Sequence, residues 1–184
     1  MNIIPDPAEV DSNDRFSERT TSILLASGWR AGRAVDVRGI DEQIFARCGL
    51  RMSPVVRLFL TEFSGIRLIK PHEGEIGSFD PIDAATEEKS LWNSWYRGLR
   101  DLTKGDAYPL GTETDSGCLL MRNDGAVFSI YMMYDWLVFL GHTGDEALEA
   151  LCAPEYHLGG VAFGNDGGLT MVNLPEFEEQ RNRC

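Results

Sequence analysis

The first seventy residues repeat apolar positions three and four apart and break at glycine, a pattern that predicts three helices before a strand. Helices are expected over residues 16–26 and 41–48, and a third after Ser53 and Pro54, which suit a helix cap and a first helical position. The positions expected to face the core are Phe16, Thr20, Ile23 and Leu24, then Ile44, Phe45 and Cys48, then Val55, Val56, Phe59, Leu60 and Phe63. The glycines expected to end the helices are Gly28, Gly49 and Gly65.

The pattern changes to period two after the third helix. Residues 66–70 alternate as a strand does, with Ile66, Leu68 and Lys70 on one face. The elements expected next are a short strand near residues 76–79 and a helix from Asp80-Pro81 towards Arg97.

Turn residues separate apolar runs in the second half of the chain, which predicts antiparallel strands. Extended segments are expected near residues 108–111, 117–122, 126–132 and 136–140. Asn123-Asp124-Gly125 is a hairpin turn, because these residues tolerate positive φ. Thr143, with Glu146 three residues later, forms a capping box for a helix over residues 144–152. After Pro154 a further hairpin is expected from residues 157–163 and 169–173.

This order of elements indicates an α+β fold with a mainly antiparallel sheet. The chain of 184 residues has the length of one domain with extensions. We expect a flexible N-terminal arm over residues 1–13, a single domain over 14–174 and a charged tail over 175–184.

The chain is acidic, with 17 Lys and Arg against 29 Asp and Glu and a net charge of −12. Such a surface repels phosphates and anionic lipids, so neither nucleic acid nor membrane is an expected partner, whereas a basic protein is. The acidity could also serve solubility alone. The N-terminus lacks the features of a secretory signal and no apolar stretch approaches the roughly 20 residues of a membrane span, so we expect a cytoplasmic protein.

No residue pattern indicates catalysis or a bound cofactor. The widely spaced cysteines form no zinc or redox motif and look like core residues of a reducing compartment. Cys118 and His142 could belong to a thiol-based catalytic set, but Cys118 falls in a strand and His142 precedes a helix cap. We therefore expect no enzyme, no cofactor, and neither catalytic nor metal-binding residues.

Three groups of residues could contact a partner. Glu113, Asp115, Asp124 and Asp135 could hold a divalent metal, but a solvated acidic rim is favoured because no EF-hand spacing accompanies them. The run Tyr131 to Trp136 is rich in aromatics and methionine, so one side can face the core and the other a partner. In Gly28 to Arg33, Trp29 could anchor a partner, but packing behind the first helix, with Arg33 tied to a carboxylate such as Asp36, is favoured.

Several segments of the chain match motifs of a known family in their order and spacing. They are LLASGWRAGRAVD (24–36), FLTEFSGIRL (59–68), FDP (79–81), YPLG (108–111), LLMRNDGAVFSIY (119–131) and FLGHTGDEALEAL (139–151). Over residues 16–152 the chain resembles the SUKH superfamily, and within it the SUKH-3 group. The hairpin after Pro154 lies beyond the usual family core, either as an addition or as a completion of the sheet.

The resemblance implies a curved, mainly antiparallel sheet backed by helices. It also implies a bacterial immunity protein that binds and blocks a cognate toxin domain of a polymorphic or contact-dependent system, often a nuclease or a nucleic-acid deaminase. The alternative is a regulatory interaction scaffold, like the eukaryotic relatives of this superfamily that act in cell-wall synthesis. The family motifs carry over no binding residues, so the contact prediction comes from this chain alone. It comprises Glu113, Asp115, Tyr134, Asp135 and Trp136.

Overall fold

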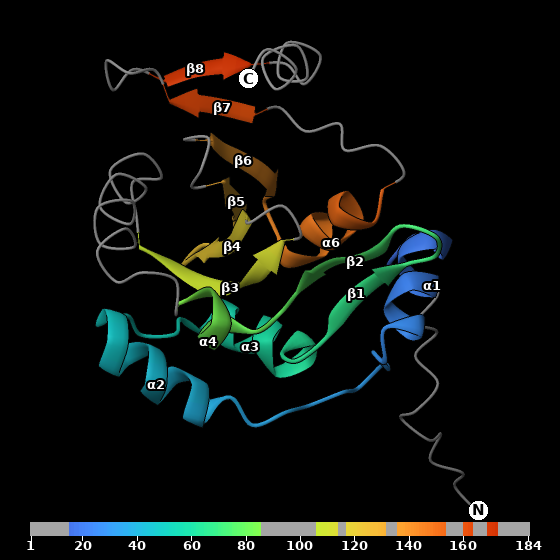
Figure 1. Ribbon diagram of the computed structural model, residues 1–184. Coiled ribbons are helices and arrows are strands. Elements are labelled where there is room, and N and C mark those ends of the chain that lie inside the picture. The colour runs from blue at the N-terminus through green and yellow to red at the C-terminus, as the bar shows by residue number, and fades with distance from the viewer. Residues whose placement is uncertain are drawn as a thin grey trace, which may run out of the picture.

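The computed structural model describes residues 15–85, 106–113, 117–131, 136–153, 160–163 and 169–172 (Figure 1). The described helices are α1 (Glu18–Ala26), α2 (Arg38–Cys48), α3 (Pro54–Phe63), α4 (Pro81–Ala84) and α6 (Gly144–Cys152). The described strands are β1 (Arg67–Lys70), β2 (Gly74–Ser78), β3 (Ala107–Glu113), β4 (Gly117–Arg122), β5 (Val127–Tyr131), β6 (Trp136–Gly141), β7 (Gly160–Phe163) and β8 (Leu169–Val172). The expected arm, the tail and the continuation of the fourth helix towards Arg97 lie outside the described residues.

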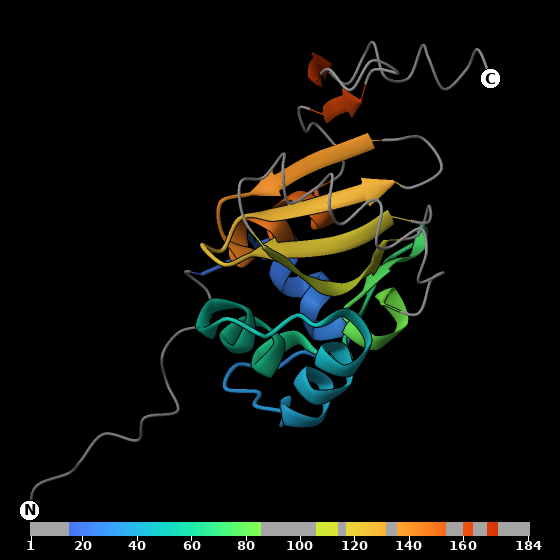
Figure 2. The same cartoon turned by 90° about the vertical axis from the view of Figure 1, so that its left-hand side faces the viewer.

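The strands form one antiparallel sheet in which each strand pairs with the next along the chain, from β1 to β8. The sheet is curved and open, and α1 and α6 lie against one of its faces (Figure 2). The α+β class with a curved antiparallel sheet backed by helices is therefore confirmed. The hairpin after Pro154 extends the sheet, because Leu137 of β6 pairs with Val161 of β7.

Helix α3 begins where Ser53 predicts, whereas α1 begins at Glu18, two residues after the expected Phe16, because Ser17 caps it. Ser17 and Ser53 each accept a hydrogen bond from the backbone N–H three residues later, which satisfies a free donor at the helix start. Thr20, Ile23 and Leu24 of α1 are buried. Val56, Phe59, Leu60 and Phe63 of α3 are buried as well.

Helix α2 differs from its prediction at its start and on one side. It begins at Arg38 because the Asp36 carboxylate accepts a hydrogen bond from the Arg38 backbone N–H, 3.0 Å away. Ile44 is fully buried as expected, but Phe45 is 43% exposed. Phe45 instead lies under the Arg51 guanidinium, outside the main core.

Lys70 is buried at the end of β1, on the face that the alternation predicts, with Leu68. It is 5% exposed, and its Nζ donates to the Ala153 carbonyl at 2.8 Å and lies 3.4 Å from Glu73. A buried ammonium needs such partners, because an unpaired charge in the core is strongly unfavourable. Lys70 thereby joins β1 to the end of α6.

The hairpin of β4 and β5 has the predicted turn. Gly125 has φ of 101°, and its N–H donates to the Arg122 carbonyl at 2.9 Å. At α6, Thr143 accepts from the Glu146 N–H at 3.2 Å, as a capping box requires. The Glu146 carboxylate reaches one residue further back than expected and accepts from the His142 N–H at 2.8 Å.

Apolar side chains cover both faces of the sheet. The main core lies between the sheet and the helices and includes Leu24, Leu60, Leu119 and Leu148. A second cluster occupies the opposite face; its buried members are Ala84, Ala107, Cys118, Leu120, Ile130 and Leu137. Burial on both faces makes the central strands a rigid frame for whatever the surface binds.

Candidate partner-binding surface

Glu113 is buried, so the solvated acidic rim expected at this residue is wrong. It is 8% exposed, and its Oε2 accepts a hydrogen bond from the fully buried Ser129 hydroxyl at 2.5 Å. Glu113 pairs across the sheet with Gly117, and Gly117 pairs with Tyr131, which packs on the main core. Residues paired in this way point to the same face, so the alternation of β3 turns Glu113 inward.

In sequence, the other predicted contact residues follow the end of β3 or stand at and just before the start of β6. Asp115, Tyr134 and Asp135 fall outside the described residues. Trp136 is the first residue of β6, where its backbone pairs with Tyr131 and Ala162, and its side chain is not described. Their contact with a partner stays a prediction.

Asp124 does not join Glu113 in one acidic group. Strand β4 separates them, since Glu113 pairs with the first residue of β4 and Asp124 follows the last. A six-residue strand spans roughly 17 Å. Asp124 instead contacts Arg122, whose guanidinium lowers the pKa of that carboxyl to about 2.

Trp29 is part of the core, as the favoured interpretation of the Gly28–Arg33 turn holds. It is 2% exposed and stacks on Phe63 with ring centroids 6.3 Å apart. Its indole N–H donates to Glu62 at 3.0 Å.

Arg33 stabilises this turn through different partners from those expected. It donates to the backbone carbonyls of Glu62 at 2.6 Å and Ser64 at 2.7 Å, while Asp36 pairs with Arg38. The last carbonyls of a helix lack partners within the helix, which makes them strong acceptors for a guanidinium.

Cys118 and His142 lie at opposite ends of the central strands. Cys118 is buried near the start of β4, opposite Ile130. His142 is exposed and follows Gly141, which pairs with Val127 at the far end of β5. Nor do three or more His, Cys, Asp or Glu side chains converge as metal ligands anywhere in the described ranges.

An arginine-rich surface joins the end of α2 to α3. Asp41 accepts hydrogen bonds from the Met52 N–H at 2.8 Å and from Arg57 at 3.3 Å, and lies 3.9 Å from Arg51. The guanidinium carbon of Arg51 lies 3.4 Å from the centre of the Phe45 ring. We call Asp41, Phe45, Arg51 and Arg57 the Arg51 surface.

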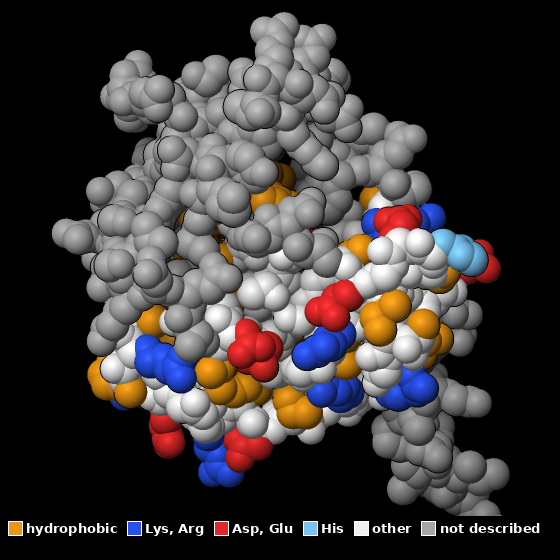
Figure 3. Space-filling view, viewed as in Figure 1, with side chains coloured by type: hydrophobic (Ala, Val, Ile, Leu, Met, Phe, Trp, Pro, Cys, Tyr) orange, Lys and Arg blue, Asp and Glu red, His pale blue; other side chains and the backbone are white. Residues whose placement is uncertain are grey.

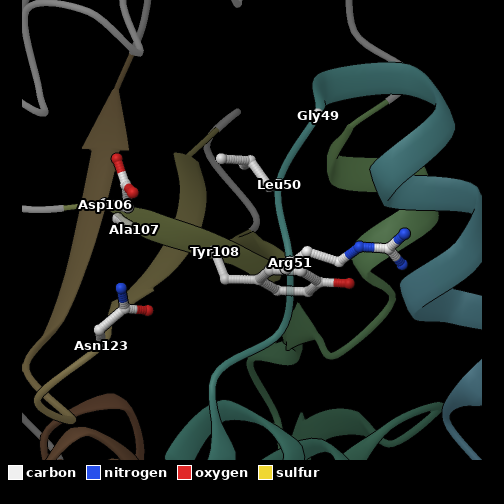
Figure 4. Close-up of a pocket in the computed structure, with 7 residues that line it drawn as sticks. All are labelled: Gly49, Leu50, Arg51, Asp106, Ala107, Tyr108 and Asn123. Atoms are coloured by element: carbon white, nitrogen blue, oxygen red, sulfur yellow. The ribbon is translucent and has the colours of Figure 1, made fainter.

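A hollow of about 280 Å³ adjoins the Arg51 surface. It is lined by residues 49–51, 106–108 and Asn123 (Figure 4). Tyr108 is 1% exposed, and its hydroxyl has no hydrogen-bond partner among the residues that the structure describes. Burial raises the pKa of this phenol well above its usual range, with a further contribution from the Asp41 charge.

The Arg51 surface belongs to a segment whose charge is opposite to that of the whole chain. Residues 15–70 contain ten Lys and Arg and five Asp and Glu, so their net charge is +5, and the rest of the chain carries −17. Figure 3 shows Lys and Arg side chains interspersed with Asp and Glu and with apolar side chains on the face that it draws. The total charge concealed this segment, although counting along the sequence would have found it.

Comparison with known proteins identifies the chain. Searches of curated proteins and of solved structures find no significant match. A family model described as SUKH-3 immunity protein matches residues 16–154, from the start of the core at Phe16 to just past the end of α6. This span includes the Trp29 turn, the Asn123 to Gly125 hairpin and the capped helix α6, and it covers most of the chain, which therefore belongs to the SUKH-3 immunity protein family.

Proposed function

We propose that this protein protects its cell by binding a cognate toxin domain of a polymorphic or contact-dependent toxin system and blocking it. The observation that carries the proposal is the family match over residues 16–154, since the family is one of immunity proteins. We place the action in the cytoplasm. No helix in the described parts of the chain has the length and apolarity to cross a bilayer.

The proposed toxin is a basic nuclease or nucleic-acid deaminase. A net charge of −12 would accelerate encounter with a basic protein, because long-range attraction raises association rates. A toxin that binds nucleic acid needs cationic groups for the phosphates, and an acidic protein can occupy those groups in place of the nucleic acid.

The proposed contacts include Asp115, Tyr134, Asp135 and Trp136, near the end of the sheet where β3 ends and β6 begins. Aromatic side chains at this end would provide the buried anchors that dominate binding energy, and the carboxylates would pair with toxin cations. Glu113 would support this end from within, through its hydrogen bond to Ser129.

Co-expression tests the proposal. The toxin domain encoded beside this gene should arrest growth when produced alone, and production of this protein should restore growth. The absence of a neighbouring toxin gene, or of any rescue, would favour the regulatory scaffold. When the purified toxin is titrated with this protein, inhibition should be complete at one equivalent of this protein. An enzyme that modifies the toxin would inhibit it at a far lower ratio of protein to toxin.

A further inference from the structure

We propose that the Arg51 surface is a second recognition site, which binds carboxylate side chains of the toxin with Arg51 and Arg57 and an apolar side chain with Phe45. This inference rests on the proposed function and specifies part of its contact surface. It involves none of the partner-contact residues predicted from the sequence.

Phe45 and Arg51 have the composition and geometry of a binding anchor. Phe45 is a large aromatic left 43% exposed on α2, where the sequence pattern predicted burial. Arg51 lies 3.4 Å from the centre of its ring, and a cation over an aromatic face is held there by electrostatic attraction. A guanidinium already held in place loses less conformational entropy when it binds a carboxylate.

The charges at this surface favour an anionic partner. Asp41 supplies one carboxylate to two guanidinium groups, and one of its oxygens also accepts the Met52 N–H. Each guanidinium carries five N–H donors in a fork that matches a carboxylate, so donors remain for a partner. Arg51 and Arg57 pair with Asp41, whereas Arg15, Arg19, Arg67 and Lys70 pair with carboxylates from outside the segment, so the excess positive charge is local to the Arg51 surface.

Tyr108 lies beneath the Arg51 surface and carries a buried donor. Its buried hydroxyl lacks a hydrogen-bond partner within the described residues, which disfavours the structure as it stands. Figure 4 shows the hydroxyl and the Arg51 side chain extending in the same direction, towards α2 and away from Asp106 and Asn123. The buried hydroxyl is closed to a partner in this structure, so Arg51, whose side chain is 58% exposed, is the group that a partner carboxylate can reach.

A protein carboxylate fits this surface better than a nucleic-acid phosphate does. The chain as a whole carries −12, which opposes the approach of a polyanion, whereas a toxin that is basic overall can still offer one or two carboxylates locally.

Binding of the adjacent toxin domain to variants tests the inference. Arg51→Glu should weaken affinity about thirtyfold, the loss that marks a binding hot spot, and Phe45→Ala should weaken it at least tenfold. Arg38→Glu is the matched control, since Arg38 is 81% exposed on α2 and lies outside the Arg51 surface; its affinity should stay within threefold of wild type. Thermal unfolding checks that each variant folds, and Arg51→Gln replaces Arg51→Glu if the latter does not.

The outcomes separate this inference from the proposed function. If the wild-type protein neither binds nor protects, both fail. If it protects and the Arg51 variant binds with wild-type affinity, the Arg51 surface is rejected and the function stands. The inference is also overturned if the variant loses only self-association in sedimentation, or only binding to a short DNA duplex.

Discussion

Replacing Glu113 by lysine distinguishes a framework role for the end of β3 from a contact role. A surface contact would tolerate the change and lose only affinity. At its observed position the new ammonium would replace a carboxylate that is 8% exposed and 2.5 Å from the Ser129 hydroxyl. Ser129 would lose its acceptor, and a cation would enter the edge of the main core.

The loss of stability can be bounded from these contacts. A hydrogen bond to a charged group is worth about 1.5–3 kcal/mol. An unpaired buried charge costs several kcal/mol more, although a long lysine can direct its ammonium towards water. We expect a loss of at least about 3 kcal/mol, which for a chain of this length lowers Tm by roughly 6–12 °C.

Thermal unfolding followed by circular dichroism measures this effect. Glu113→Gln keeps the shape and an acceptor, so its free energy of unfolding should fall by about 1 kcal/mol. Glu42→Lys makes the same charge change at an exposed position of α2 and should stay within about 0.5 kcal/mol of wild type. If the Glu113→Lys variant has the Tm of wild type and associates more slowly with the toxin domain, the buried, structural placement of Glu113 is refuted.

Three further changes test the fold. Gly111→Ala should lower the free energy of unfolding in urea by about 1–3 kcal/mol, because the new Cβ would lie 1.8 Å from the Ser78 carbonyl oxygen. The control Gly39→Ala, whose Cβ would enter open space, should not lower it. The Asp124→Asn variant should be less stable than wild type at neutral pH, because the pKa of Asp124 is lowered to about 2 in the folded protein. The difference in stability should vanish as pH falls from about 4 to about 2, and a pH-independent difference would contradict this reasoning. Burial raises the pKa of Cys152 to about 11, so mass spectrometry should find it unmodified by iodoacetamide at pH 8 until urea is added; rapid native labelling would count against its burial.

Local signals predicted most of the described fold because each acts over a few residues. The Ser53 cap, the Asn123 to Gly125 turn and period-two alternation place α3, β4 and even the buried Lys70 correctly. The failures depend on distant partners. Arg33 binds the end of α3 rather than nearby Asp36, and Phe45 packs under Arg51 and stays 43% exposed instead of joining the core. Neither arrangement follows from spacing, because it depends on how separate elements meet.

The candidate site was harder to predict for a related reason. Charge and exposure were inferred from position in sequence, but β3 turns Glu113 inward and β4 separates it from Asp124. The whole-chain charge of −12 favours acidic contact residues, although it is the sum of a segment of +5 and a remainder of −17. Four cations of that segment pair with carboxylates from outside it, namely Arg15, Arg19, Arg67 and Lys70. Arg51 and Arg57 instead pair with Asp41 inside the segment, so their positive charge is a local feature. A local cationic group can fix the register of a partner that the acidic chain as a whole attracts. Reversing Arg51 should then impair docking while leaving most of the long-range attraction intact.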